Sequence, residues 1–126
     1  MPLVRIDMCK GKDAAYRQAI SRAVHQALTS VGVPPDDRFQ IISEHAAENF
    51  VFDPSYLGIQ RSENLVMIQI TWNEGRTLEQ KKALFRSIAD GLASAPGVRQ
   101  EDVLVNLVEV KKENWSFGRG VAQYAS

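Results

Sequence analysis

The strongest constraint on the fold of this chain is an internal repeat, because two stretches carry the same residue pattern at a constant spacing of 65 positions. The matches include turn glycines, acidic residues near strands and apolar positions of a helix. The matched pairs are Gly32 with Gly97, Val33 with Val98, Asp37 with Asp102, Glu44 with Glu109, Ile20 with Phe85, Ala23 with Ile88, and Ala27 with Leu92. Such a pattern indicates a duplicated supersecondary unit. We therefore expect a single domain over residues 1–126, with copies at about 1–62 and 63–126.

Each copy has the periodicity of a strand, a helix and a second strand. Alternating apolar and polar residues predict strands, and apolar residues spaced by three and four predict an amphipathic helix. The predicted strands cover 2–8, 38–44, 65–72 and 103–110, and the predicted helices cover 13–31 and about 78–95. These elements predict an α/β (α+β) fold, in which duplicated β-α-β units form a four-stranded mixed sheet with two helices on one face.

The residues that open the predicted helices suit an N-cap. Asp13 precedes the first helix and Thr77 the second, and either side-chain oxygen can accept a hydrogen bond from a free amide of the first turn. Glu79 lies only two residues after Thr77, so we do not expect a capping box, which needs its acceptor three residues on. Gly32 is expected to end the first helix.

Composition excludes several classes of function. The 15 basic and 15 acidic residues balance, which gives no electrostatic reason to expect nucleic acid or an anionic membrane as a partner. The single cysteine, Cys9, cannot form an internal disulfide and is interpreted as a packing residue. No group of histidine, cysteine and carboxylate residues has ligand spacing, so no metal or other cofactor is expected. Without a leader or a long apolar run, the chain is expected to be cytoplasmic.

The sheet is expected to need a partner. Two helices can cover only one face of a four-stranded sheet, whereas the predicted third strand is apolar on both faces. Met67 lies on one face, and Val66 and Ile68 lie on the other. Because a large exposed apolar face marks an interaction surface, we predict a homo-oligomer in which neighbouring subunits can contribute to a pocket.

Pro2 is the first candidate for chemistry. It follows the initiator methionine and opens the first strand, and a small residue at this position favours removal of Met1. The resulting N-terminal secondary amine would have a pKa that burial and a nearby cation could lower toward neutrality, where an amine serves as a general base. A proline in second place is also a common way to begin a chain, so this residue alone is weak evidence.

Topology adds two residues to Pro2. The crossover of a β-α-β unit makes its strands parallel, which brings Asp37, at the head of the second strand, to the edge where Pro2 lies. If the two units pack antiparallel, the end of the third strand and Arg76 reach the same edge. Arg76 could hold a substrate carboxylate through paired hydrogen bonds, and Asp37 could orient water or relay a proton. The alternatives are a solvated Arg76 and a turn residue at Asp37.

These features resemble the tautomerase superfamily, small enzymes with an N-terminal proline, and within it the malonate semialdehyde decarboxylases. The similarity spans nearly the whole chain. It is carried by Met1-Pro2-Leu3, Gly32-Val33-Pro34, Asp37-Arg38-Phe39-Gln40, Leu57-Gly58 with Arg61-Ser62, Arg76 with Glu79-Gln80-Lys81, and Trp115-Ser116-Phe117-Gly118-Arg119-Gly120.

The resemblance implies a homotrimer with helices outside and sheets inside. It also implies Pro2 as catalytic amine, Asp37 as its polar partner and Arg76 as carboxylate binder. Trp115 and Phe117 would form an apolar wall at the substrate, together with Tyr124, and simple packing of the tail is the alternative. One residue departs from the decarboxylase pattern, because Glu74 stands where that pattern has a second arginine.

Three functions follow from these residues. The first is a keto–enol tautomerase that acts on a small 2-oxo acid, with Pro2 as general base. The second is a lyase or hydratase on a 3-oxo acid such as malonate semialdehyde, with a protonated Pro2, which Glu74 disfavours because it would repel an anionic substrate. The third is a non-catalytic oligomeric module that binds a small effector. His45, after the second strand, is a further candidate for the pocket.

Overall fold

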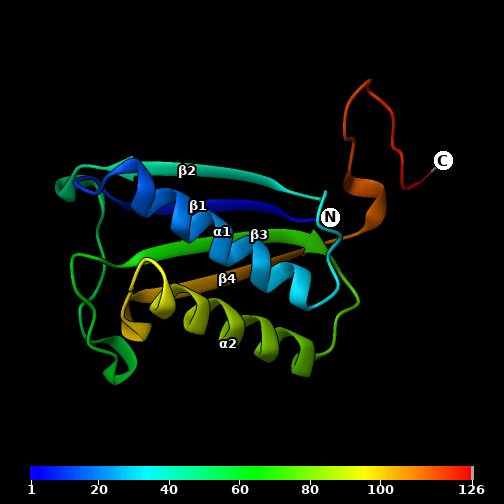
Figure 1. Cartoon of the computed structure of the whole chain (residues 1–126). Coiled ribbons are helices and arrows are strands. Elements are labelled where there is room, and N and C mark those ends of the chain that lie inside the picture. The colour runs from blue at the N-terminus through cyan, green and yellow to red at the C-terminus, as the bar shows by residue number, and fades with distance from the viewer. Residues whose placement is uncertain (126) are drawn as a thin grey trace.

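The computed structural model describes residues 1–125 and contains all six predicted elements (Figure 1). In chain order they are β1 (Leu3–Cys9), α1 (Ala14–Ser30), β2 (Phe39–His45), β3 (Val66–Asn73), α2 (Leu78–Ser94) and β4 (Val103–Val110). Each predicted strand lies within one residue of the observed one, and the bounds of the fourth agree. The periodicity of apolar residues was therefore sufficient to locate every main element.

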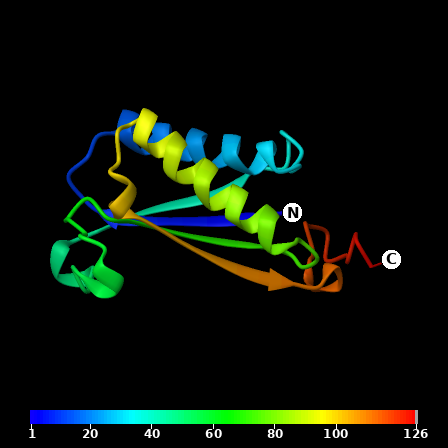
Figure 2. The same cartoon turned by 90° about the horizontal axis from the view of Figure 1, so that it is seen from below.

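The four strands form one mixed sheet in the order β2-β1-β3-β4. Strand β1 is parallel to β2 and β3 is parallel to β4, as expected for two β-α-β units. The units meet where β1 pairs antiparallel with β3. Both helices pack on the same face of this sheet, which Figure 2 shows from the side. The predicted fold and the antiparallel arrangement of the two units are thus confirmed.

The core lies between the helices and the sheet. The strands contribute alternate residues to it, because side chains of a strand point to opposite faces in turn. Its buried strand residues are Val4, Ile6, Met8, Val66, Ile68, Ile70 and Trp72. The large buried helix residues are Ile20, Val24, Leu28, Leu84, Ile88 and Leu92. Burial of these side chains supplies the main favourable free energy of folding.

The spacing of the repeat is not constant, which corrects the prediction of a uniform 65. The buried residue Leu84 matches Ile20 at a spacing of 64, and the N-caps Asp13 and Thr77 share that spacing. The predicted match of Ile20 with Phe85 is wrong, because Phe85 is exposed. The predicted matches of Ile88 with Ala23 and of Leu92 with Ala27 are also one residue off, since the spacing of 64 pairs Ile88 with Val24 and Leu92 with Leu28. After the helices the spacing becomes 65, since the turn that follows α2 contains one more residue than the turn that follows α1.

Both predicted N-caps are confirmed, and one helix start is stronger than predicted. The Asp13 carboxylate accepts a hydrogen bond from the Tyr16 amide at 2.9 Å. Thr77 accepts from the Gln80 amide, and the Gln80 side chain accepts from the Thr77 amide, so α2 begins with a full capping box. The prediction against a box was wrong because it considered Glu79, whereas Gln80 occupies the third position and is an equally good acceptor.

The remaining segments lie around the sheet. Between β2 and β3 the chain forms short 3-10 turns at η1 (Ala47–Asn49) and η2 (Tyr56–Gly58). After β4 it forms the turn η4 (Lys112–Asn114) and then a hooked tail, with no strand among its described residues (Figure 1). Over residues 1–125, no helix is long and apolar enough to cross a membrane.

The face of the sheet opposite the helices, which we call the open face, carries exposed apolar side chains. Phe39 and Ile41 of β2 are 51% and 44% exposed, and Leu104 of β4 is 38% exposed. Arg5 and Asp7 of β1 also lie on this face, because they alternate with the buried residues of that strand. The open face therefore offers apolar surface in a single chain.

Candidate active site

Three segments that are distant in sequence meet at one end of the sheet, where β1 and β2 begin and β3 ends. Leu3 pairs with Phe39 on one side and with Thr71 on the other. Pro2 therefore lies beside the last residues of β3, and Asp37 lies just ahead of β2. Figures 1 and 2 both show the N-terminus at this edge, next to the end of β3 and the C-terminal tail. We call it the amine edge.

The terminal amine lies next to Asp37. The α-amino nitrogen of Met1 is 3.5 Å from Asp37 Oδ2, and the following residue, Pro2, is buried. While Met1 is present, the nitrogen of Pro2 is an amide without a hydrogen. Removal of Met1 would make this nitrogen the chain terminus, one residue along the same strand.

Two buried polar atoms at the amine edge lack a hydrogen-bond partner. They are Asp37 Oδ1 and Trp72 Nε1, and they are the only buried side-chain nitrogen or oxygen atoms of residues 1–125 without one. Buried polar groups are satisfied in nearly all native structures, so unpaired ones call for an explanation. A hydrogen-bond donor would satisfy Asp37 Oδ1, and an acceptor would satisfy Trp72 Nε1; a polar ligand or a neighbouring chain could supply these groups.

Arg76 lies at the same edge, two residues before α2. Its Nη1 donates to the backbone oxygen of Asn73 at 2.8 Å, and its guanidinium carbon lies 4.0 Å from the centroid of the Trp72 ring. This stacking is a cation–π contact that holds the side chain against the end of β3. Burial lowers the pKa of Arg76 and the nearby Glu109 carboxylate opposes this shift, so the side chain stays cationic.

Aromatic residues of the tail stack on one another next to the end of β3. Trp115 donates its Nε1 hydrogen to Asn73 Oδ1 at 2.7 Å, which ties the tail to the end of β3. The rings of Trp115 and Phe117 stack with centroids 5.6 Å apart, and Tyr124 packs edge-on against Phe117 at 4.8 Å. Phe117 and Tyr124 remain exposed. The three aromatic residues of the tail thus form one stack, which Trp115 ties to the end of β3, and their contact with a substrate stays a prediction.

Sequence reasoning missed two contributors to this edge. Asn73 holds Arg76 through its backbone oxygen and Trp115 through its side chain. Glu109 of β4 forms an ion pair with Lys81 at 2.7 Å and lies close enough to Arg76 to affect its pKa. The signal for Asn73 was its place at the end of the strand that leads to Arg76.

His45 does not reach the amine edge. It ends β2 at the opposite end of the sheet, where its Nε2 pairs with Asp7 Oδ1 at 2.6 Å. Glu74 is exposed, and its amide donates to the backbone oxygen of Val110. No group of three or more histidine, cysteine or acidic residues within 1–125 is arranged to hold a metal ion.

The arrangement of groups at the amine edge suits acid–base chemistry on a small anion. It combines an amine next to a carboxylate, a guanidinium fixed on an indole and an adjoining aromatic stack. An amine can accept and release a proton, and a fixed guanidinium can orient a carboxylate.

Comparison with known proteins relates the chain to one family. Two family models, each described as "Tautomerase enzyme", match residues 37–118 and residues 2–60. The probable tautomerase YusQ of Bacillus subtilis is 44% identical over 124 residues, which cover 98% of each chain. The 2-hydroxymuconate tautomerase of Pseudomonas putida is 45% identical over 49 residues, covering 39% of this chain and 78% of that one.

Solved structures agree with this relationship. An FG41 malonate semialdehyde decarboxylase superposes with a TM-score of 0.91 at 40% identity, over 97% of this chain and 93% of the other. Another malonate semialdehyde decarboxylase has the same TM-score at 32% identity, covering 97% and 95%. A fused 4-OT symmetric trimer, at 23% identity and a TM-score of 0.80 over 98% of each chain, shares the fold. The chain belongs to the tautomerase family.

Proposed function

We propose that this enzyme is a keto–enol tautomerase that acts on a small 2-oxo acid and uses Pro2 as its general base. The proposal requires removal of Met1, which frees the Pro2 nitrogen. The observation that carries it is the unpaired, buried Asp37 Oδ1 next to the terminal amine. A terminal proline would supply an N–H donor at the place where this oxygen lacks one.

The proposed reaction moves one proton across the enol. In the enol-to-ketone direction, the neutral Pro2 nitrogen takes the hydroxyl proton and returns a proton to the neighbouring carbon. In the reverse direction it takes the proton alpha to the carbonyl. Asp37 stabilises the ammonium that exists between the two transfers, because a nearby opposite charge favours the protonated form.

Arg76 is proposed to bind the substrate carboxylate. Its Nη1 is used by Asn73, and the stacking on Trp72 fixes the plane of the guanidinium. A fixed plane favours paired hydrogen bonds to a carboxylate. Trp115 and Phe117 would then cover the apolar part of the acid. This division of charge and apolar surface favours a 2-oxo acid with a hydrophobic side chain, such as phenylpyruvate.

A lyase or hydratase on a 3-oxo acid such as malonate semialdehyde is the second candidate. Asp37 favours it, because a carboxylate beside the amine raises the pKa of that amine and so favours a protonated Pro2. The two decarboxylase structures support the same reading. Glu74 opposes it only weakly, since the exposed position of this residue lets its carboxylate point into solvent.

We further propose that the chain works as a homotrimer. The apolar open face supports this proposal, because assembly would remove Phe39, Ile41 and Leu104 from water. The symmetric trimer formed by the fused 4-OT supports a threefold arrangement. Phe117 and Tyr124 are also exposed in the single chain, which leaves room for a neighbouring subunit to complete the substrate pocket.

The test is a phenylpyruvate enol–keto assay on untagged protein, with intact mass to verify the loss of Met1. We expect Pro2→Ala to lower kcat/KM by about 100-fold or more, the usual range for loss of a general base. Arg76→Ala should lower it by about 10- to 100-fold, the usual cost of one charged hydrogen bond. Arg86→Ala, on the outer side of α2, is the matched control and should have no effect.

Two outcomes would contradict the tautomerase proposal. One is a wild-type rate no higher than that of Pro2→Ala. The other is retention of Met1 in fully active protein, because the Pro2 nitrogen would then be an amide. Malonate semialdehyde in the same panel separates the two candidates, since faster turnover of this substrate than of phenylpyruvate would favour the lyase. No Pro2-dependent turnover of either substrate would favour a non-catalytic binding module.

A further inference from the structure

The internal repeat produces a counterpart of the amine edge at the other end of the sheet. At the amine edge, the end of β3 meets the starts of β1 and β2. At the other end of the sheet, the end of β1 meets the starts of β3 and β4 in the same way. We call this second place the closed edge. Asp102 takes the position of Asp37 there, because Asp102 directly precedes β4 and Asp37 lies two residues before β2, at matching positions of the repeat.

The loops at the two edges have the same conformation. Lys10-Gly11-Lys12 follows β1 as Glu74-Gly75-Arg76 follows β3. Gly11 and Gly75 have φ angles of +126° and +116°, a region that side chains avoid. The Lys10 amide donates to the His45 oxygen at 2.8 Å, and the Glu74 amide donates to the Val110 oxygen at 2.9 Å. Lys12 therefore occupies the place that Arg76 has at the amine edge.

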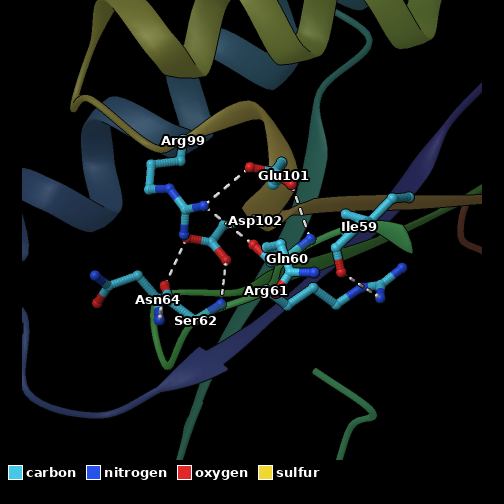
Figure 3. Close-up of polar contacts among 8 residues, drawn as sticks. All are labelled: Ile59, Gln60, Arg61, Ser62, Asn64, Arg99, Glu101 and Asp102. Carbon is cyan, nitrogen blue, oxygen red and sulfur yellow. Dashed lines mark hydrogen bonds and ion pairs between the residues drawn. The ribbon is translucent and has the colours of Figure 1, made fainter. Parts of the chain in front are cut away.

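The two edges differ in the use of their aspartate. Asp102 is fully buried and accepts from the Ser62 amide at 2.7 Å and from the Ser62 hydroxyl at 2.6 Å, with Arg99 at 3.4 Å (Figure 3). The chain continues through Leu65 into β3, so no terminal amine exists here. The closed edge has thus lost the amine, and its carboxylate holds the preceding loop in place.

A cavity remains at the closed edge. Its volume is about 260 Å³, and its floor is formed by the buried side chains of Met8, Leu65 and Val66. Because a water molecule in the liquid occupies about 30 Å³, there is room for a small organic acid. The loop of Lys10 and Lys12 forms part of the wall.

The charges around the cavity favour an anion. Lys10 and Lys12 form no ion pair with any of residues 1–125, whereas Glu63 is the single acidic residue of the lining. The Lys12 ammonium lies 5.2 Å from the centroid of the Tyr16 ring, at the cavity. Burial, and then Asp102, raise the pKa of Tyr16, so its hydroxyl remains a neutral donor.

We infer that the cavity at the closed edge is a second, non-catalytic binding site for a small organic carboxylate. Lys10 and Lys12 bind the carboxylate, and Met8, Leu65 and Val66 contact its apolar part. The lysines and the apolar floor of the cavity are the reason to expect a carboxylate with an apolar part. Only the choice of a 2-oxo acid as the ligand rests on the proposed function. Each chain would then bind two acids, one at the amine edge, where an amine can act as a base, and one at the closed edge, where no amine is present.

An NMR titration with pyruvate tests the two edges separately. The amides of Gly11 and Gly75 report on the closed edge and the amine edge, and perdeuterated, ¹⁵N-labelled full-length protein makes both observable. We expect both signals to shift and saturate. Lys10→Gln with Lys12→Gln should raise the Kd read at Gly11 by about tenfold or more, the usual effect of losing one charged hydrogen bond. The Kd read at Gly75 and the phenylpyruvate rate should stay unchanged.

Controls keep this result separate from the proposed function. Arg76→Gln should raise only the Kd read at Gly75. Arg22→Gln with Lys82→Gln removes two exposed helix charges elsewhere and should change neither site. A Gly11 signal that stays still at about 20 mM pyruvate, or a shift unaffected by loss of both lysines, overturns the inference. A Gly11 site that persists in protein without Pro2-dependent activity supports the inference while the proposed function fails.

Discussion

At the scale of single residues, Asp37 and Asp102 show how one position of a repeat can serve chemistry in one copy and structure in the other. Asp102 has hydrogen bonds at both oxygens. Asp37 has one oxygen near the terminal amine and the other unpaired. A carboxylate with one oxygen next to an amine and the other unpaired can respond to a proton on its neighbour, whereas a fully bonded one mainly stabilises the fold.

Asp37→Asn should change the pH dependence of tautomerisation. Loss of the negative charge disfavours the protonated Pro2 amine, so the pKa of that amine falls. Because the neutral amine is the active base, the acid limb of the kcat/KM profile should move to lower pH by about one unit. Asp36→Asn, at an exposed turn residue, is the matched control and should leave the limb in place. A limb that moves to higher pH would contradict the role proposed for Asp37.

At the scale of elements, the start of α2 and the tail hold the amine edge in shape. Helix α2 begins one residue after Thr77, whose capping box fixes the turn that carries Arg76. The tail attaches to the end of β3 through Asn73, which also accepts from Arg76. Arg76 is therefore held from the helix side and from the strand side.

Thr77→Ala should lower the free energy of unfolding by about 1 kcal/mol, the usual effect of losing an N-cap side chain. Thermal or urea denaturation followed by circular dichroism measures the change. Ser94→Ala, at the exposed end of the same helix, should change stability by less than about 0.5 kcal/mol. Equal effects of the two substitutions would show that the capping box adds nothing to stability.

Asn73→Leu should release the tail from the sheet. The indole hydrogen of Trp115 loses its acceptor, so Trp115 becomes mobile and KM for phenylpyruvate rises more than kcat falls. Trp115→Phe removes the same hydrogen bond from the other side. Because the two residues share one bond, the double variant should cost less than the sum of the single variants. Additive effects on KM would mean that this bond does not position the aromatic wall.

At the scale of the whole molecule, the helices leave one face of the sheet without cover. The open face combines exposed apolar residues of β2 and β4 with the charged residues of β1. The amine edge lies at one end of this sheet, and the aromatic stack of the tail, with Phe117 and Tyr124 exposed, is tied to it through Asn73. Assembly through the open face and completion of the substrate pocket are therefore expected to occur together.

Ile41→Lys combined with Leu104→Lys should convert the proposed trimer into monomers, because each lysine places a charge within an apolar contact. Sedimentation equilibrium measures the mass, and circular dichroism verifies the fold. Val51→Lys is the matched control, since Val51 is 85% exposed and lies in the segment between β2 and β3. An unchanged trimer in the double variant would place the interface elsewhere.

Most of the fold was predictable from the sequence, because the spacing of apolar residues reflects the local geometry of a strand or a helix. Strand alternation and helical spacing of apolar residues located six elements, and the repeat indicated their arrangement in two units. The one-residue change in spacing after α2 was not visible, because Phe85 and Leu84 are both apolar and only packing distinguishes them. The capping box was missed because the prediction considered only Glu79, at the second position after Thr77, whereas Gln80 at the third position is the acceptor.

The sequence by itself determined the two β-α-β units and brought Pro2, Asp37 and Arg76 to one edge, because strand direction follows from chain connectivity. Tertiary structure decided what each group does there. It left Asp37 Oδ1 unpaired, stacked Arg76 on Trp72 and tied Trp115 to Asn73. It also closed the equivalent edge with Ser62 and Asp102. Such contacts join residues up to 42 positions apart, and their distances depend on how the elements pack in three dimensions.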